Sequence, residues 1–445
     1  MRNSSFPLVP ALIALLALAP SLRADELSQL REQLRALEKK LLVLERKQEI
    51  QDERVAVTDK GVTVASADGA NALKLRGLVQ LDSRLFLSDH GIVNNAFVLR
   101  RARLIAEGTL AKNFSFQLVP EFGGGSPAIV DANLGWTVTP QLQFKFGRFK
   151  SPVGLELLQS DSWTFFDERS IVTNLVPNRD LGLTASGEIL NGTVSYTVGF
   201  VGGVADGAST TNTDFDNEKD VVGRIFATPF KNDPGLPLQG LSFGIAGSYG
   251  REKGTAGRTG GYRTDGQQTF FSYLAATFTD GPNWRLSPQF DYRHGSLGLQ
   301  GEYVVSTVNV RASAAGKLTE LQNKAWQLSA GYVLTGENSS SAGVVPANNF
   351  DLGKGTWGAF EVAGRYANLQ IDDAAFPLYA SPAANAGEAT SFGLGLNWYL
   401  SKAVRFTFDY YQAKFDRAPG APATLTNPVI RQDEKSLLTR FQVSF

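Results

Sequence analysis

The sequence predicts an all-β fold, a transmembrane antiparallel β-barrel of about 16 strands preceded by a short N-terminal coiled-coil helix. Three observations support this prediction. Apolar and polar residues alternate with period two over most of the chain, the last strand ends on an aromatic residue, and the N-terminus has the composition of an export signal. In a barrel that crosses a bilayer, the apolar face of each strand meets lipid and the polar face lines the lumen.

The C-terminal strand is the most specific of these signals. Leu437, Phe441, Val443 and Phe445 fall on one face, and polar residues occupy the other. A strand that ends a soluble protein seldom leaves an apolar face uncovered, because an exposed edge invites aggregation. A terminal Phe suits the aromatic girdle of an outer-membrane barrel. We therefore expect the chain to lie in the bacterial outer membrane, in contact with its lipid, and the barrel-assembly machinery to bind the strand that ends in Phe445.

Residues 1–24 are predicted to be a signal peptide. Arg2 supplies a positive charge, residues 8–19 form an apolar stretch too short to span a bilayer, and residues 20–24 end on a small residue before Asp25. The short apolar stretch disfavours the alternative, a membrane anchor. The mature chain is expected to begin near Asp25 and to be exported.

Composition excludes several classes of protein. The 445 residues include no Cys and only two His, His90 and His294, so disulfides, thiolate metal sites and His-centred catalytic triads are not expected. Apart from the signal, no apolar run has the length of a membrane-spanning helix. Lys plus Arg equals Asp plus Glu at 43 each, so the net charge indicates no preference for either sign. We expect no enzymatic activity, no metal, no cofactor and no nucleic-acid partner.

Residues 25–60 are the predicted periplasmic coiled-coil segment. Its leucines repeat every seven residues in two series, Leu27, Leu34 and Leu41 in the first and Leu30, Leu37 and Leu44 in the second. In a parallel assembly the flanking pairs, Lys40 with Glu45 and Lys47 with Asp52, are opposite in charge. This charge pattern favours a parallel homo-oligomer over an antiparallel hairpin, and the charges that flank the narrow leucine seam disfavour an amphipathic helix lying on the barrel or membrane. Leucine at both core positions leaves dimer or trimer open.

Residues 61–445 are predicted to form the barrel. We count seventeen alternating runs, residues 270–279 among them, and an odd number cannot return both ends of the barrel to one side of the membrane. One run must therefore be misread, and sixteen strands, the size class of water-filled porins, is the prediction. Short turns alternate with long Gly-, Ser-, Asn- and Ala-rich connections, which are expected at the external side. These long connections are residues 205–220, 251–268, 336–355, 374–388 and 416–434.

The candidate pore-lining residues are basic. Arg101 and Arg103 share one face of their strand with Glu107, and Arg100 is expected on the other face. An Arg that faces lipid at the bilayer midplane costs about 2–4 kcal/mol. Arg101 and Arg103 should therefore face the lumen.

Further candidates, Lys145, Arg148 and Lys150, precede a long connection that reaches Arg179. The connection is expected to fold into the barrel and narrow it; the alternative is an external loop at a subunit contact. Lys145 and Arg148 have opposite parity, so only one of them can face the lumen unless a bulge near Gly147 resets the register. The expectation of an inward fold rests on three aromatic residues in the connection, Trp163, Phe165 and Phe166.

Several segments resemble the phosphate-selective porin family, porins O and P. The likeness rests on residues 97–103, 147–156, 166–170, 332–337 and 357–366 and on the terminal strand, which are spread over nearly the whole barrel. The resemblance implies a homotrimer of sixteen-stranded barrels, each narrowed by inward-folded loops. It also implies a lumen lined by basic side chains that pass phosphate or polyphosphate.

The chain departs from the family pattern in its middle. Family members carry a dense ladder of arginines there, whereas this sequence offers only Arg224 in its strand and further arginines in a loop. Many other lumen candidates, Arg365 and Arg405 included, have an acid on the same face two or four residues away, about 6–13 Å along the strand, which partly neutralises them. The expected pairs are Arg84 with Asp82, Arg103 with Glu107, Arg293 with Asp291, Arg365 with Glu361 and Arg405 with Asp409.

These features together predict a porin that allows passive diffusion of small anionic solutes such as phosphate. A moderate preference for anions fits the neutralised pairs better than a tight phosphate site. Two alternatives stay open at the level of sequence. One is a general non-selective porin, and the other is a structural outer-membrane anchor linked to the cell wall through its coiled coil.

Overall fold

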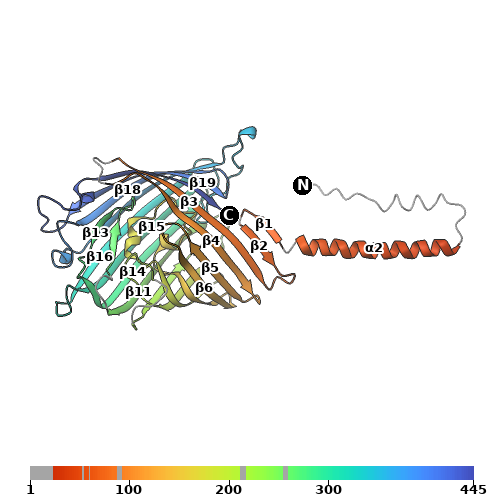
Figure 1. Ribbon diagram of the computed structural model, residues 1–445, viewed down its shortest axis with the longest axis horizontal. Helices are drawn as coiled ribbons and strands as arrows, with labels where there is room; N and C mark the ends of the chain where they lie inside the picture. The colour runs from red at the N-terminus through yellow and green to blue at the C-terminus, as the bar shows by residue number, and fades with distance from the viewer. Residues whose placement is uncertain (1–23, 53–54, 60, 88–92, 211–216, 254–258) are drawn as a thin grey trace.

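The computed structural model describes the chain apart from residues 1–23, 53–54, 60, 88–92, 211–216 and 254–258, so the predicted signal peptide lies outside the described residues except for Ala24. Sixteen strands form a closed antiparallel barrel (Figure 1). They are β3 (Ala72–Phe86), β4 (Ala96–Leu110), β5 (Phe114–Glu121), β6 (Ala128–Thr139), β7 (Leu142–Lys150), β8 (Arg179–Ile189), β9 (Val194–Val201), β10 (Asp220–Ala227), β11 (Leu241–Lys253), β14 (Phe278–His294), β15 (Leu297–Arg311), β16 (Thr319–Val333), β17 (Ala359–Gln370), β18 (Ala386–Tyr399), β19 (Val404–Arg417) and β20 (Glu434–Ser444).

The C-terminal strand closes the barrel by pairing with the first one. Phe441 of β20 lies opposite Leu81 of β3, and Gln442 lies opposite Gln80. Phe441 and Leu81 are exposed on the outer wall, whereas both glutamines are buried in the lumen. Period-two alternation therefore continues across the closure, as a barrel with an apolar outer face requires.

The prediction of sixteen strands is confirmed, and residues 270–279 are the misread run. They include β13 (Thr269–Ser272), which pairs with β12 (Gly261–Arg263) in a separate hairpin, and the start of β14. Phe270 and Phe271 are fully buried in a core shared with residues of β15–β18. Their apolar character comes from packing inside the barrel and not from contact with lipid.

The N-terminal elements extend from one end of the barrel. The hairpin of β1 (Val55–Thr58) and β2 (Gly61–Ala65) continues the sheet because β2 pairs with β3. The helix α2 (Ala24–Asp52) projects away from the barrel at the end where the C-terminus also lies (Figure 1). We call this the terminus end and the opposite end the loop end. Leu37, Leu41 and Leu44 of the predicted leucine series are each about two-thirds exposed on the single helix, at 67%, 60% and 62%.

Among the residues that the structure describes, no helix combines the length and the apolar character needed to cross a membrane. The remaining helices are short. They are α3 (Leu155–Leu158), η1 (Ile171–Leu175), η2 (Pro237–Gly240), η3 (Leu352–Lys354), η4 (Asp373–Ala375) and η5 (Val429–Arg431).

Residues 151–178, which connect β7 to β8, lie inside the barrel, as the sequence predicted. We call this segment the inward loop; it contains α3 and η1. Val153, Leu157, Val172 and Leu175 of the loop are almost fully buried, in one core with side chains from β15–β18. The loop is stable inside the barrel because its apolar side chains are buried against apolar side chains of the inner wall.

One long connection lies at the end opposite to the one that the sequence pattern suggested. Residues 334–358 join β16 to β17 at the terminus end, where short turns were expected. The backbone N–H of Ser339 donates to the carbonyl of Gly295 (2.8 Å), and Val344 is buried beside Trp163 of the inward loop. This terminus-end loop therefore meets the tip of the inward loop within the barrel.

Candidate functional site: a cation-lined passage through the barrel

The inward loop is fixed to one side of the lumen. The backbone N–H of Leu155 donates to the Glu302 carboxylate of β15 (2.8 Å). Asn397 of β18 donates to the carbonyl of Phe165 (2.7 Å), and Arg405 of β19 donates to that of Thr164 (2.9 Å). The loop thus fills the side of the barrel formed by β14–β20. The side formed by β3–β8 remains for a passage.

Arg365 is one of the most deeply buried residues that hold the inward loop in place. Its side chain is 0% exposed, and its guanidinium lies 2.5 Å from Asp265 and 3.4 Å from Glu156. It also donates to the carbonyl of Glu168 (3.0 Å) and stacks 4.4 Å above the centre of the Phe166 ring. A guanidinium with this many partners fixes the loop and is not available to a solute.

A second set of charges holds the loop at the barrel closure. The Glu168 carboxylate contacts Arg100 at 2.5 Å, Arg84 at 3.1 Å and Arg440 at 3.3 Å. Arg440 of β20 also forms a two-pronged pair with Asp82 of β3, at 2.7 and 2.8 Å. One loop carboxylate is therefore tied to both strands of the closure and to β4.

The first cavity of the passage opens toward the loop end and has a volume of about 530 Å³. Among the described residues that line it, six side chains are cationic and three are anionic. The cations are Arg100, Arg101, Arg103, Arg169, Arg179 and Arg263, and the acids are Asp161, Glu168 and Asp206.

The second cavity, of about 360 Å³, lies deeper along β3–β8. It shares Arg103, Asp161 and Arg179 with the first, so these three residues mark the junction of the two cavities. Of its described lining residues, five are basic and two acidic. The bases are Arg76, Arg103, Lys145, Lys150 and Arg179, and the acids are Asp131 and Asp161.

The junction is built around Asp161. Its carboxylate lies 3.3 Å from Arg101 and 2.6 Å from Arg169, and it also binds Arg103. Arg179, which also borders both cavities, forms a bidentate ion pair with Asp131 at 3.1 and 3.2 Å. The junction and its immediate surroundings therefore carry more guanidinium groups than carboxylates.

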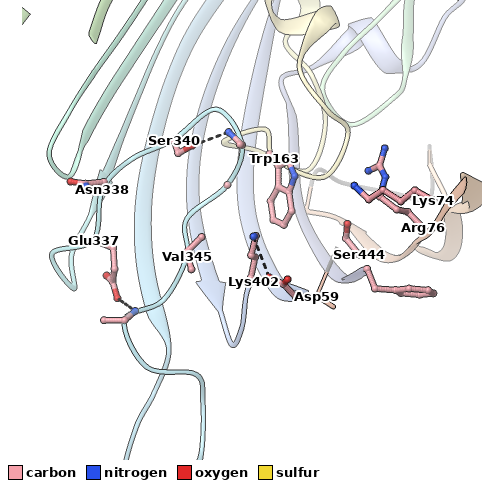
Figure 2. Close-up of a pocket in the computed structure, with 14 residues that line it drawn as sticks. Asp59, Lys74, Arg76, Trp163, Glu337, Asn338, Ser340, Val345, Lys402 and Ser444 are labelled. Atoms are coloured by element: carbon pink, nitrogen blue, oxygen red, sulfur yellow. Dashed lines mark hydrogen bonds and ion pairs between the residues drawn. The ribbon is translucent and has the colours of Figure 1, made fainter. Parts of the chain in front are cut away.

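A third cavity, of about 650 Å³, opens at the terminus end and shares Arg76 and Ser444 with the second. Figure 2 shows Trp163 pointing into this space between the terminus-end loop and the barrel wall, with Lys402 paired to Asp59 (3.2 Å) across from it. Its charges nearly balance among the described lining residues. Three are basic (Lys74, Arg76 and Lys402) and two acidic (Asp59 and Glu337).

The structure separates the sequence-predicted candidates into groups. Arg101, Arg103, Lys145 and Lys150 line the cavities of the passage. Arg365 and Arg405 instead anchor the inward loop, as described above. The Arg224 guanidinium donates a hydrogen bond to the Gln289 side chain of β14 (3.1 Å). Arg148 donates to the backbone carbonyl of Ile129 (2.7 Å). Arg224 and Arg148 line none of the three cavities.

Arg100 was expected on the outer face, and the structure corrects this expectation. A β-bulge occurs in β4, because Gln80 pairs with Arg101 and Leu81 with Leu99. The extra residue is Arg100, and its guanidinium reaches Glu168 of the inward loop. A bulge resets the alternation locally, so neighbouring arginines can both turn inward.

Arg169, Asp161 and Asp131 were not predicted from the sequence. Arg169 and Asp161 lie in a loop, where period-two alternation gives no signal, and Asp131 is the one charged residue of its strand. The charged residues of the inward loop were the nearest signal in the sequence, but the prediction for this loop rested on its aromatic residues. Elsewhere, the described residues contain no group of three or more His, Asp or Glu side chains placed to hold a metal ion.

A closed sixteen-stranded barrel with an apolar outer wall and linked polar cavities defines a diffusion channel of the outer membrane, a porin. The sequence profile of the family Phosphate-selective porin O and P matches residues 73–445, and the chain belongs to this family. It is a channel of the outer membrane and not an enzyme.

Individual relatives agree with this assignment. Porin O of Pseudomonas aeruginosa is 26% identical over 421 residues, which cover 86% of this chain and 91% of that protein. Two solved structures share the fold at low identity. The outer membrane channel DcaP of Acinetobacter baumannii has a TM-score of 0.54 at 12% identity, over 86% of this chain and 99% of that one. An anion-selective porin from Comamonas acidovorans has a TM-score of 0.51 at 12% identity, over 84% and 100%.

Proposed function

We propose that this porin conducts small anions by passive diffusion along β3–β8, with a moderate preference over cations. The observation that carries the proposal is the excess of Arg and Lys over Asp and Glu in the first two cavities. A charge excess of one sign in a narrow, low-dielectric passage raises the local concentration of ions of the opposite sign. Family membership supports an oxyanion such as phosphate among the solutes.

The pairing of the charges argues for moderate selectivity. Arg101, Arg103 and Arg179 each contact a carboxylate, so part of their field is already neutralised. Arginine still suits oxyanions because its guanidinium remains charged and offers paired donors. Conduction also requires that binding stay weak enough for release, which several partly neutralised cations provide better than one deep site.

The arrangement in the membrane is part of the proposal. We place the terminus end in the periplasm, with α2 projecting into it, and the loop end outside the cell. We assign three chains to the assembly, because α2 exposes a leucine seam and because OmpT of Vibrio cholerae, which shares the fold with a TM-score of 0.52, has a trimer form. The outer wall contacts lipid, and the strand that ends in Phe445 is the element for the barrel-assembly machinery.

Reversal potentials across a planar bilayer test the selectivity. With a tenfold KCl gradient across the purified porin, we expect a potential of the sign that chloride permeation gives. Replacing chloride with phosphate should preserve this sign, and replacing potassium with a large organic cation should change it little. A potential near zero or of the opposite sign would contradict the proposal.

A further inference from the structure

The Asp161 carboxylate occupies a position that an incoming anion would find attractive. Three guanidinium groups converge on it: Arg101 and Arg103 from the β4 wall, and Arg169 from the inward loop itself. All four side chains are at most 14% exposed, so water screens these contacts little. Arginine donors bind carboxylate and phosphate oxygens with the same geometry.

Backbone contacts, and not only its charge, hold Asp161 at the junction of the two cavities. Gln80 donates to the carbonyl oxygen of Asp161 (2.9 Å), and Gln442 donates to that of the next residue, Ser162 (3.1 Å). Lys150 and Arg169 both donate to the carbonyl of Gln159, at 2.7 and 2.9 Å. The loop is therefore held by hydrogen bonds to its backbone carbonyls, and these bonds do not depend on the Asp161 carboxylate.

The arginine cluster has donor capacity beyond what Asp161 uses. Arg101 is 6% exposed, and its Nε has no hydrogen-bond acceptor within the part of the chain that the structure describes. The other acid at the cluster, Glu121, is bound to Arg103 at 2.6 Å. A buried N–H without an acceptor is uncommon in proteins, so Asp161 and Glu121 do not use all the donors of the cluster.

We propose that Arg101, Arg103 and Arg169 form a tetrahedral-oxyanion site whose resident anion is the Asp161 carboxylate. This inference rests on the proposed anion conduction and adds a mechanism for it. A phosphate that reaches the junction shares the three guanidinium groups with Asp161, and the fixed negative charge keeps its residence short. Asp161 thus converts a site that would trap phosphate into one that releases it, as rapid conduction requires.

The test is Asp161→Asn in the full-length porin, read as block of chloride current by added phosphate. The wild-type channel should show weak block. In D161N, the phosphate concentration that halves the chloride current should fall at least about tenfold, because charge-assisted bonds to the three arginines lose their competitor. Sulfate, of the same shape, should block likewise, whereas nitrate, which is planar and carries one charge, should block less.

The matched control is Asp131→Asn, which removes the same charge from the same passage but releases Arg179 alone. If D131N increases phosphate block as much as D161N, a general gain of positive charge explains the effect and the proposed site is wrong. Unchanged block in D161N, with an anion-selective wild type, would also overturn the site. If the wild type itself shows no anion selectivity, the proposed function fails instead.

A second variant guards against misfolding of D161N. Asp161→Ser removes the carboxylate with a smaller side chain and keeps both backbone contacts. Phosphate binding to detergent-purified D161S, measured by calorimetry, should be at least about tenfold tighter than to the wild type. Equal affinities in a folded D161S would contradict the proposal.

Discussion

At the scale of single residues, the partners of each arginine decide what it does. The side chains of three arginines are at most 2% exposed: Arg365, Arg405 and Arg440. They bind carboxylates or carbonyl groups of the inward loop on the filled side of the lumen. Removing one partner of such a buried pair typically costs about 3–5 kcal/mol, because the remaining charge stays desolvated. Arg101 and Arg103 also contact acids, but they border cavities. The first group holds the inward loop, and we propose that the second group meets the solute.

This division predicts the effect of reversing the second group. Arg101→Glu together with Arg103→Glu should move the reversal potential in a KCl gradient toward cation preference, because four units of charge change at the junction. The barrel should still assemble, because Gln442, Arg365 and Arg405 still hold the inward loop through its backbone carbonyls. Reversal potential and the trimer band in a native gel measure the two effects.

A matched control carries the same change of charge away from the passage. Lys112 and Lys231 lie exposed in turns at the terminus end, outside all three cavities. Lys112→Glu with Lys231→Glu should leave selectivity close to that of the wild type. If the junction variant also keeps wild-type selectivity, the selecting charges lie at other residues, such as Lys145, Lys150 or Arg179.

At the scale of elements, the sequence predicted the barrel well and the charge partners poorly. Alternation along one strand shows which face a side chain takes, and this placed Arg101 and Arg103 in the lumen. It does not show which residue lies opposite on the next strand. Glu107 was expected to pair with Arg103, yet it binds Arg76 of β3 at 2.7 Å. The strands β3 and β4 are neighbours, and their register brings Arg76 close to Glu107. Register depends on the closure of the whole barrel.

The predicted pairs two residues apart in one strand were correct, whereas Arg103 and Glu107, four residues apart in β4, each bind other partners. Arg293 binds Asp291 at 2.9 Å and Arg84 approaches Asp82 at 3.4 Å, two residues apart in each case. The bulge at Arg100 gave no sequence signal, since any residue can occupy it. The inward position of β12 and β13 was missed for a related reason. A run of apolar residues reads the same whether it meets lipid or a core inside the lumen.

The inward loop is the element whose removal should change conduction most. Deleting residues 155–176 should raise single-channel conductance severalfold, because the loop fills the side of the lumen along β14–β20. Conductance in 1 M KCl measures the change, and native gels report whether the oligomer persists. Shortening the exposed connection of residues 312–318 is the control and should leave conductance unaltered. Lost oligomers at unchanged conductance would instead make the loop an interface element.

At the scale of the whole molecule, the passage runs off-centre and the helix α2 extends beyond the barrel. The inward loop and the terminus-end loop meet inside the lumen, where a Cβ on Gly343 would clash with the Trp163 ring at 2.4 Å. In the proposed function, these two loops confine solutes to the wall of β3–β8. The strands of β5–β9 are also among the shortest in the barrel, at 8 to 12 residues, whereas β14–β16 have 15 to 17. The shorter strands thus overlap the proposed conducting side at β5–β8, whereas β3 and β4 have 15 residues each.

The exposed leucines of α2 predict how three chains are joined. Leu34→Asp with Leu41→Asp should lower the temperature at which the trimer dissociates by several degrees, because burying each leucine contributes about 1.5–3 kcal/mol. The matched control, Ala36→Asp with Val43→Asp, places the same charges at positions that face solvent in the predicted heptads and should leave that temperature unchanged. Native gels after stepwise heating give the measurement. Equal dissociation temperatures for both variants and the wild type would show that α2 does not form a coiled coil, and the barrel walls alone would then hold the trimer together.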